Sequence, residues 1–460
     1  MSVQIPFELL KSLSELKGFE EDAFQEAHQP GQQITSIRLN KAKVVEQILP
    51  SSLQNILAEK IPWCNTGHYL SQRPSFTLDP TFHAGAYYVQ DASSMFIEQA
   101  LLQSLDLSKP LKVLDLCAAP GGKSTLLQSL ISKDSLLVSN EVIKTRVNVL
   151  SENISKWGAA NVIVTNNDPQ HFKRLENYFD LIVVDAPCSG SGLFRKDPSA
   201  INEWSENNVA LCSQRQQRIL ADILPALKPG GLLIYSTCSY SSSENESITD
   251  WLMQTYSLSS IQLKCKDEWG IVETISPSKG GFGYRFYPHR VKGEGFFLSL
   301  LQKKEEPPSH SINKKKLPEM VSAKELAVIA PYILEPAAYG FIKLKETILA
   351  LPINILQELP ILQSALYIKK AGVQIGTLIR TALIPDHELA ISNMIQPNFP
   401  TVAVNQSVAL DYLRRAVIDI NQVEKGWALL EYEGFRLGWI KMLGNRVNNY
   451  YPKDWRILNK

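Results

Sequence analysis

Short apolar runs alternate with longer amphipathic segments through the middle of the chain, from about residue 111 to residue 304. The apolar runs predict buried strands, at 111–116, 136–139, 162–165, 179–184, 232–235 and 296–301. The segments between them predict helices, at 123–131, 147–157 and about 205–227. Continuous apolar strands separated by helices are typical of a parallel sheet that is covered on both faces. The pattern therefore predicts an α/β fold.

The two flanks of this region have a different composition. Residues 1–90 contain a pair of polar helices and the segment I-T-S-I-R-L-N, and residues 319–460 contain many short strand-like runs with tyrosines and glycine turns. Residues 305–318 are charged and proline-bearing, which is typical of a linker. A chain of 460 residues is too long to fold around one hydrophobic core. We therefore expect an N-terminal extension (1–90), a central domain (91–304), this linker and a C-terminal region (319–460).

Composition narrows the function classes only slightly. The net charge is +1, so charge alone predicts no nucleic-acid partner, and the basic segments 38–43, 288–292 and 313–316 form either basic faces or ordinary solvated surface. No apolar stretch approaches the roughly 18 residues that span a bilayer. The N-terminus also lacks the layout of a signal peptide. We therefore expect a cytoplasmic protein with no membrane partner.

The six cysteines lie far apart, with no C-x-x-C pair and no histidine cluster nearby. This spacing argues against a disulfide scaffold and against a metal site, so we expect reduced thiols and no metal. Buried cysteines usually act as small hydrophobic side chains, and we expect this of Cys64, Cys212 and Cys265. The other three cysteines each follow a predicted strand: Cys117, Cys188 and Cys238.

The loop after the first predicted strand, C-A-A-P-G-G-K-S (117–124), nearly matches the phosphate-binding pattern G-x-x-x-x-G-K-[ST]. The run L-I-V-V-D (181–185) is similar to the acidic strand that accompanies that pattern. A P-loop-like ATPase is therefore an alternative. Two features of the loop oppose it, since Cys117 replaces the first glycine and Pro120 removes a backbone N–H donor.

Two carboxylates at the ends of the next strands indicate a different ligand. Glu141, 19 residues after Gly122, can accept both hydrogen bonds of a ribose diol, and Asp168 can reach an adenine amino group, unless both are ordinary loop-capping residues. The dinucleotide fingerprint G-x-G-x-x-G is absent. We therefore expect an adenosine ligand bound without phosphate, and S-adenosylmethionine fits this description.

Two thiols and a carboxylate follow the fourth and fifth strands. Asp185 and Cys188 lie in D-A-P-C-S-G-S-G, and Cys238 lies in Y-S-T-C-S-Y, so all three are expected at the sheet edge that carries the ligand loop. A thiolate that adds to C6 of cytosine makes C5 nucleophilic enough to accept a methyl group. We expect Asp185 to hydrogen-bond the N3/N4 edge of the base, and the second thiol to help the enzyme–base bond break.

Together, D-L-C-A-A-P-G-G-K-S, D-A-P-C-S-G-S-G and Y-S-T-C-S-Y resemble the motifs of the Nop/Sun family of RNA cytosine-5 methyltransferases. The resemblance extends through Y-V-Q-D-A-S-S-M (88–95) and R-F-Y-P-H-R…G-E-G-F-F (285–297), so it covers about residues 85–304. It implies a Rossmann-like domain that uses S-adenosylmethionine as cofactor.

The resemblance also implies roles for single residues. Cys238 takes the place of the nucleophile, Cys188 the place of the thiol that is associated with release of the methylated product, and Arg146 matches a further family position. The positions for which it implies cofactor contact are Cys117, Ala118, Ala119, Pro120, Gly121, Gly122, Lys123, Glu141, Asp168 and Asp185.

Both ends of the chain refine this reading. The segment I-R-L-N (37–40) is similar to the R-x-N element of the family, and the tail 438–457 resembles the C-terminal extension of bacterial members of the RsmF type, which carries a PUA-like RNA-binding module. The resemblance implies RNA as partner, namely 16S rRNA or the 30S subunit. A non-enzymatic RNA-binding or assembly factor stays open beside the ATPase.

The tail interleaves basic and aromatic residues, which suits phosphate contact plus base stacking, or equally an aromatic core with an exposed basic rim. These residues are Arg446, Tyr450, Tyr451, Lys453, Trp455 and Arg456.

Overall fold

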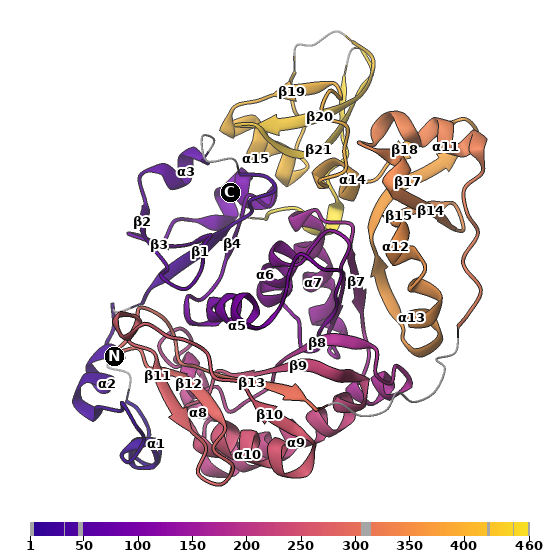
Figure 1. Ribbon diagram of the computed structural model, residues 1–460. Helices are drawn as coiled ribbons and strands as arrows, with labels where there is room; N and C mark the ends of the chain where they lie inside the picture. Colours follow the sequence, from indigo (N-terminus) through magenta and orange to yellow (C-terminus); the bar gives the residue numbers. More distant parts are fainter. Residues whose placement is uncertain are drawn as a thin grey trace.

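The computed structural model describes residues 4–31, 33–44, 49–304, 314–420, 424–444 and 446–458, and these residues build four β-sheets (Figure 1). The largest sheet has ten strands and lies in the centre. Its strand order is β11-β12-β13-β9-β8-β5-β6-β7-β16, and β10 pairs with β13 beside this path.

The middle of the central sheet is parallel, as the apolar runs predict. In it, β5 pairs with β6 and β8, β6 pairs with β7, and β8 pairs with β9. The five strands are β5 (Lys112–Asp115), β6 (Leu136–Asn140), β7 (Val162–Thr165), β8 (Phe179–Asp185) and β9 (Leu227–Thr237). The predicted α/β class is confirmed.

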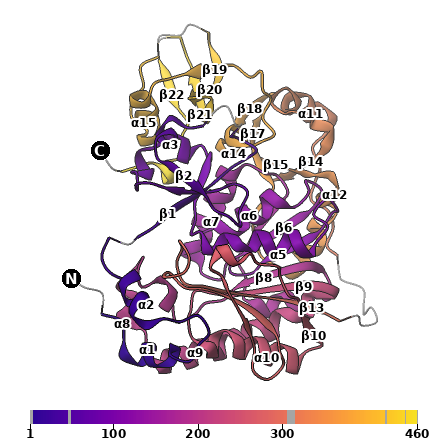
Figure 2. The ribbon, with the colours of Figure 1, turned by 60° about the vertical axis from the view of Figure 1, so that its left-hand side comes forward.

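Helices cover both faces of these strands. Neighbouring side chains of a strand point to opposite faces, and in β5 the side chains of Val113 and Leu114 belong to two different hydrophobic clusters. The helices lie on opposite sides of the sheet according to which of these two clusters they join (Figures 1 and 2). They are α5 (Ile97–Ser104), α6 (Gly122–Leu130) and α7 (Lys144–Trp157) with Val113, and α9 (Glu206–Ile223) and α10 (Glu246–Thr255) with Leu114.

Beyond β9, the central sheet continues toward one edge in antiparallel strands. The predicted strand at 296–301 is β13, which pairs antiparallel with β9. The sequence pattern did not predict the others. The antiparallel strands are β10 (Leu258–Ser260), β11 (Val272–Ile275), β12 (Phe282–Phe286) and β13 (Phe296–Lys303).

The long helix before β9 ends earlier than predicted. We expected it to reach Leu227, but α9 ends at Ile223 and a short 3₁₀ turn, η5 (Leu224–Ala226), follows. Pro225 lies in that turn and has no N–H to continue the helical hydrogen bonds. Strand β9 consequently begins at Leu227 rather than at the predicted position 232, and it includes the segment K-P-G-G (228–231).

The N-terminal part consists of two short helices and a small sheet. The helices α1 (Phe7–Leu13) and α2 (Glu21–Ala27) are the predicted pair. The sheet has the order β2-β3-β1-β4. Its strands are β1 (Thr35–Leu39), β2 (Leu57–Lys60), β3 (Gly67–Leu70) and β4 (Tyr87–Val89).

The C-terminal part contains two further four-stranded sheets, of order β14-β15-β17-β18 and β19-β20-β21-β22. The first is built from β14 (Tyr339–Leu344), β15 (Thr347–Pro352), β17 (Val373–Ile379) and β18 (Ala382–Pro385). The second is built from β19 (Thr401–Ala403), β20 (Gly426–Tyr432), β21 (Phe435–Met442) and β22 (Val447–Asn449). The predicted domain boundaries stay predictions, and residues 305–313 of the predicted linker lie outside the described residues.

The C-terminal part is joined to the rest more closely than a separate unit would be. Strand β16 (Ile368–Ala371) belongs to neither of the two C-terminal sheets. It pairs antiparallel with β7 at the edge of the central sheet. A single hydrophobic cluster also holds Ile37 of β1 together with Tyr412 and Leu430 of the C-terminal part. The N-terminal and C-terminal parts therefore share a core.

The R-x-N element fastens the N-terminal sheet to the central domain. Arg38 is fully buried; its guanidinium donates to Gln90 Oε1 at 3.0 Å and to the Gly122 carbonyl at 3.3 Å, and it lies 4.5 Å from the centre of the Trp157 ring. Asn40 donates to the carbonyl of Trp157 at 3.1 Å. Because Gly122 begins α6, this element braces the helix that follows the ligand loop.

The aromatic residues of the tail are core residues rather than an open stacking surface. Tyr451 is only 1% exposed, and its ring meets the edge of His387. Tyr450 and Trp455 are half-buried, whereas Arg446 and Lys453 are exposed, as is Arg456. Of the two alternatives for this segment, an aromatic core with a basic rim is the one observed. Within the described residues, no helix is both long and apolar enough to cross a bilayer.

Candidate active site

A cavity of about 470 Å³ lies at the carboxyl ends of the parallel strands. Ten of the predicted site residues line it: Cys117, Ala118, Ala119, Pro120, Gly122, Lys123, Glu141, Asp185, Cys188 and Cys238. Gly121 and Asp168 do not line it. Strand β4 and the following residues, Tyr88 to Asp91, close one side, and Glu294 to Phe296 close another.

Two side chains of α7 hold the loop from Cys117 to Gly122. Gly121 has a left-handed conformation, with φ of 118°, which only glycine adopts readily. The carbonyl of Ala119 accepts a hydrogen bond from Arg146 at 2.6 Å, and that of Pro120 accepts one from Asn153 at 2.8 Å. Arg146, whose role the sequence left unclear, therefore fixes the shape of this loop.

The wall that follows β6 combines one acceptor with an apolar surface. Glu141 is 3% exposed; its Oε1 accepts the backbone N–H of Ile143 at 2.9 Å, and its Oε2 lies 3.7 Å from Arg146, beyond hydrogen-bond distance. Val142 and Ile143, about half exposed, line the cavity beside it. A carboxylate next to two apolar side chains fits a ribose beside an adenine ring.

Asp168 caps a turn beside the cavity, which is one of the two alternatives stated for it. Its Oδ1 caps the turn after β7 by accepting the backbone N–H of Gln170 at 3.1 Å, and its Oδ2 lies 3.5 Å from Arg218. The residue before it, Asn167, exchanges two hydrogen bonds with the backbone of Tyr367, at 3.0 and 2.9 Å. The C-terminal part thus holds this turn, and cofactor contact by Asp168 stays a prediction.

The two thiols that follow β8 and β9 meet. The sulfur atoms of Cys188 and Cys238 lie 2.9 Å apart, which is well beyond the roughly 2.05 Å of a disulfide, and both cysteines are free. The hydrogen bond with Cys238 and burial raise the pKa of Cys188 well above its ordinary value. Cys188 therefore keeps its proton and can donate it in a hydrogen bond to a thiolate at Cys238.

Lys123, in the first turn of α6, lines the same cavity as the two thiols. Lys123 Nζ lies 2.6 Å from Asp185 Oδ2, and Asp185 Oδ1 accepts from the hydroxyl of Ser236 at 2.9 Å. Burial acts to lower the pKa of Lys123, but Asp185 and, less strongly, the charge of a Cys238 thiolate raise it overall. The side chain of Lys123 thus joins the start of α6 to Asp185 at the end of β8.

The remaining cysteines follow the expectation only in part. Cys212 is buried as predicted. Cys64 is buried too, but its thiol donates to Glu98 Oε2 at 3.1 Å, so it is part of a polar contact. Cys265 is half-buried rather than buried, because it packs at the rim of a hydrophobic cluster.

Sequence reasoning missed several residues of the site wall. Tyr88, Gln90, Asp91 and Glu294 line the cavity, and they lie in the two segments that carried only the family likeness. No spacing rule marks them as functional, since they come from far-apart loops. Among the described residues, no group of three or more His, Cys, Asp or Glu side chains is arranged to hold a metal ion.

Comparison with known proteins identifies the family. Residues 102–302 match the family described as 16S rRNA methyltransferase RsmB/F, residues 5–92 match the N-terminal domain of 16S rRNA methyltransferase RsmF, and residues 399–457 match the methyltransferase RsmF PUA domain. The ribosomal RNA small subunit methyltransferase F of Aeromonas salmonicida is 30% identical over 438 residues, which cover 91% of this chain and 90% of the relative.

The chain belongs to the RsmB/F family of methyltransferases. A second relative within it, ribosomal RNA small subunit methyltransferase F of Shewanella loihica, is 29% identical over 91% of this chain and 88% of its own. The RsmB/F family accounts for the two flanking matches as well as for the central domain, and it leaves the ATPase alternative without support.

Solved structures agree with this assignment. A methyltransferase homolog protein from Pyrococcus horikoshii, 29% identical, superposes with a TM-score of 0.52 over 65% of this chain and 100% of its own. NSun6 from the same organism shares the fold, with a TM-score of 0.54, 19% identity, and coverage of 65% of this chain and 99% of its own.

Proposed function

We propose that this methyltransferase transfers a methyl group from S-adenosylmethionine to C5 of a cytosine in small-subunit rRNA. The observation that carries the proposal is the contact between Cys188 and Cys238, 2.9 Å apart at the mouth of the cavity that the ligand loop also lines. A single thiol is sufficient to bind a ligand or to fill space. A pair, of which one is kept protonated, suits the formation and the breakdown of a covalent adduct.

The cavity fits the proposed cofactor. Glu141 offers its carboxylate to a ribose diol, and Val142 and Ile143 offer an apolar surface to adenine. The loop from Cys117 to Gly122 lines the cavity, so its backbone is available to a bound cofactor. When bound, S-adenosylmethionine supplies an electrophilic methyl group on a sulfonium.

The first chemical step belongs to Cys238. Its thiolate adds to C6 of the cytosine, a C–S bond forms, and the electron pair of the C5–C6 double bond makes C5 the nucleophile that takes the methyl group. Asp185, fixed by Lys123 and Ser236, holds the edge of the base during this step. The target base must leave its stack, because C5 and C6 are inaccessible within a helix.

The second step releases the product, and we assign it to Cys188. Once Cys238 has formed its C–S bond, Cys188 no longer has a thiolate beside it to which it donates, and it acts as the base after its proton has passed to solvent. It then takes the C5 proton, the C5–C6 double bond forms again, the C–S bond breaks, and Cys238 leaves as a thiolate.

The flanking parts support rRNA as the partner. The relatives of similar length are named for ribosomal RNA of the small subunit, and the chain matches their PUA domain at 399–457. The exposed cations of this region, Arg446, Lys453 and Arg456, suit contact with phosphates. We extend the proposal to 16S rRNA, as free RNA or within the 30S subunit.

The test compares 16S rRNA from cells with and without this protein, mapped for 5-methylcytosine by mass spectrometry. We expect at least one cytosine that is methylated only in the presence of the protein, and transfer of labelled methyl from S-adenosylmethionine to the same position with purified protein. Identical maps, together with no transfer to free 16S rRNA or to 30S subunits, would refute the proposal.

A further inference from the structure

One buried carboxylate joins the two thiol-bearing loops, and the chemistry described above does not use it. Glu244 is fully buried. Its Oε2 accepts hydrogen bonds from the hydroxyls of Ser189 at 2.5 Å and Ser239 at 2.6 Å. Its Oε1 accepts the backbone N–H of Ser189 at 2.8 Å and the amide of Gln216 at 3.1 Å. The carboxylate therefore receives four donors, which fills its acceptor sites.

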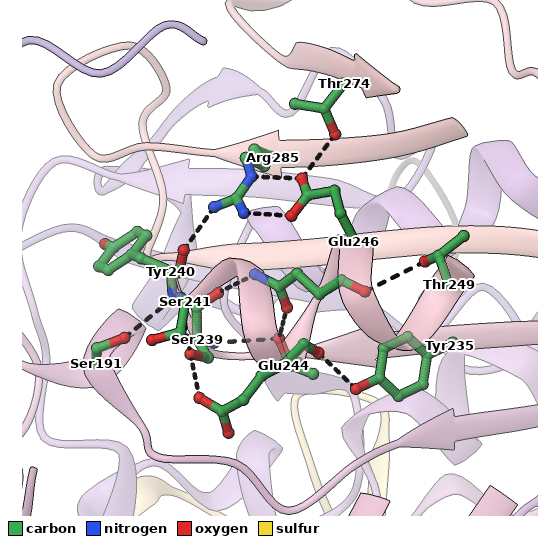
Figure 3. A network of polar contacts seen from close by, with 12 residues as sticks. Ser191, Tyr235, Ser239, Tyr240, Ser241, Glu244, Glu246, Thr249, Thr274 and Arg285 are labelled. Atoms are coloured by element: carbon green, nitrogen blue, oxygen red, sulfur yellow. Dashed lines mark hydrogen bonds and ion pairs between the residues drawn. The ribbon is translucent and has the colours of Figure 1, made fainter. Parts of the chain in front are cut away.

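The residues that Glu244 holds are the direct neighbours of the thiols. Ser189 follows Cys188, and Ser239 follows Cys238. The two serine hydroxyls lie 3.2 Å apart, and the two sulfur atoms lie 2.9 Å apart. Figure 3 shows the carboxylate of Glu244 directed toward Ser239. The separation of the thiols thus depends on two loops that meet at one side chain.

The residues after Glu244 brace the Cys238 loop further. Asn245 accepts from the hydroxyl of Thr237 at 2.6 Å and donates to the carbonyl of Ser239 at 2.8 Å, so it holds the loop on both sides of the thiol. In the same network, Arg285 donates to the carbonyl of Tyr240 at 2.6 Å (Figure 3). The Cys238 loop therefore has several braces, and it also meets the other loop directly, since Gly192 donates its N–H to the Cys238 carbonyl at 2.8 Å. Glu244 is the side chain that binds the residues next to both thiols.

We propose that Glu244 is a positioning residue that sets the separation of Cys188 and Cys238 by holding Ser189 and Ser239. Its catalytic consequence rests on the proposed function, whereas its effect on geometry does not. A hydrophobic residue would fill the same space without joining the loops. Burial of a carboxylate is unfavourable in free energy. Here four hydrogen bonds from three segments of the chain compensate for it.

The charge of Glu244 has a second effect. It adds to the hydrogen bond with Cys238 and to burial in raising the pKa of Cys188. Glu244→Gln removes this charge but keeps most contacts, because serine hydroxyls can rotate and accept from an amide. Glu244→Ala removes the contacts as well. The two variants therefore separate geometry from charge.

A matched control is available nearby. Asp250 on α10 is also a buried carboxylate, and it accepts the backbone N–H groups of Ser278 at 3.0 Å and Lys279 at 2.7 Å. It contacts neither thiol loop through these bonds. Asp250→Asn therefore reports what the loss of a buried carboxylate does to stability alone.

The first measurement tests geometry without any substrate. Diamide takes up two hydrogens from two thiols, becomes a hydrazine, and leaves a disulfide, so the rate of the Cys188–Cys238 crosslink, followed by mass spectrometry of peptides, reports their proximity. We expect the wild type, Glu244→Gln and Asp250→Asn to form the crosslink at similar rates and Glu244→Ala to form it at least about tenfold more slowly. Equal rates in Glu244→Ala, or no crosslink in the wild type, would overturn the proposal.

The second measurement tests chemistry. With rRNA and S-adenosylmethionine, we expect Glu244→Ala to lower kcat about tenfold or more with an unchanged KM for cofactor, and Glu244→Gln to shift the pH profile of adduct breakdown to lower pH, since less negative charge lowers the pKa of Cys188. Profiles and kcat like those of Asp250→Asn would overturn the proposal. Should the wild type itself form no adduct, the proposed function fails, and the crosslink rates still decide the role of Glu244.

Discussion

The sulfur atoms of Cys188 and Cys238 lie 2.9 Å apart although they follow two different strands. Strands β8 and β9 are parallel neighbours, and Asp185 is the register partner of Ser236. The two strands therefore end at the same level of the sheet. Cys188 then comes three residues after Asp185 and Cys238 two residues after Ser236. Parallel pairing therefore explains why the two motifs meet, and Glu244 accepts hydrogen bonds from Ser189 and Ser239 at this meeting point.

Substitution of the two thiols should give opposite results. Cys238→Ala removes the nucleophile, so we expect methyl transfer to fall to below about a thousandth of the wild-type rate, with binding of S-adenosylhomocysteine unchanged. Cys188→Ala leaves the nucleophile but removes the group assigned to release, so a covalent protein–RNA species should accumulate. Denaturing gel electrophoresis with labelled RNA measures this species.

The control for the thiol variants is Cys212→Ala. Cys212 is buried on α9, so its loss should affect stability slightly and leave both methyl transfer and adduct turnover at wild-type levels. Adduct accumulation in Cys238→Ala, or its absence in Cys188→Ala, would contradict the assignment of the two sulfurs.

Gly192 should tolerate no side chain, because two other backbone segments lie close to its Cα. A Cβ there would lie 2.5 Å from the Gly295 carbonyl oxygen and 2.7 Å from that of Cys238. Gly192 also donates its N–H to the Cys238 carbonyl at 2.8 Å. Gly192→Ala should push the Cys238 loop away and lower kcat roughly tenfold or more, with a smaller change in cofactor affinity.

The matched variant is Gly230→Asn, at a glycine with φ of 75° where an added Cβ meets nothing within 4 Å. Asparagine tolerates this left-handed conformation, so activity should stay at the wild-type level. Steady-state kinetics and isothermal titration with S-adenosylhomocysteine measure both variants. Wild-type kcat in Gly192→Ala would show that the loop accommodates the methyl group elsewhere.

The sequence predicted the parts of the site that parallel strands place at one edge. Cys117, Glu141, Asp185, Cys188 and Cys238 each come within a few residues of an apolar run, and the carboxyl ends of parallel strands meet. Periodicity and motif spacing therefore located these residues without any tertiary contact. Their mutual distances did not follow, because loop geometry depends on side chains such as Glu244.

The sequence did not predict contacts that depend on docking between parts of the chain. Arg38 reads as a basic surface residue, yet it is fully buried against α6. Tyr451 has the composition of a stacking residue, yet the tail packs it against His387. Strand β16 is four residues long, and its pairing with β7 spans about 200 residues of sequence, which no local pattern reports.

Lys43 should stabilise the contact between the N-terminal part, α7 and the C-terminal part of the chain. Its ammonium donates to three backbone carbonyls, of Ala84 at 2.8 Å and of Lys156 and Ile391 at 2.6 Å, which belong to the N-terminal part, α7 and the C-terminal part. Lys43→Met would leave all three acceptors without this donor. We expect the free energy of unfolding to fall by roughly 3 kcal/mol.

Urea unfolding followed by fluorescence measures this loss. Lys41→Met is the matched control, since Lys41 is exposed two residues away, and it should change stability by less than about 0.5 kcal/mol. A Lys43→Met variant as stable as Lys41→Met would contradict the role of Lys43 as a junction between the parts.

His387 should make the protein sensitive to acid. Neither of its ring nitrogens has a hydrogen-bond partner in the described part of the chain, and burial, followed by the charges of Lys156 and Lys43, lowers its pKa from 6.5 to about 3. Between these two values the unfolded chain binds a proton that the folded protein does not bind. The stability contributed by neutral His387 is thus fully present above about pH 6.5 and is lost as pH falls toward 3.

We therefore expect His387→Leu to reduce the dependence of unfolding free energy on pH by up to roughly 1.4 kcal/mol per pH unit between pH 6 and pH 4.5. Urea unfolding at several pH values in this range measures the slope. His28 and His83, whose pKa values burial lowers to about 4, preserve part of the dependence. His171→Leu, at a half-buried surface position on the turn after β7, is the control, and a His387→Leu slope equal to that of the control would show that this ring is protonated within the fold.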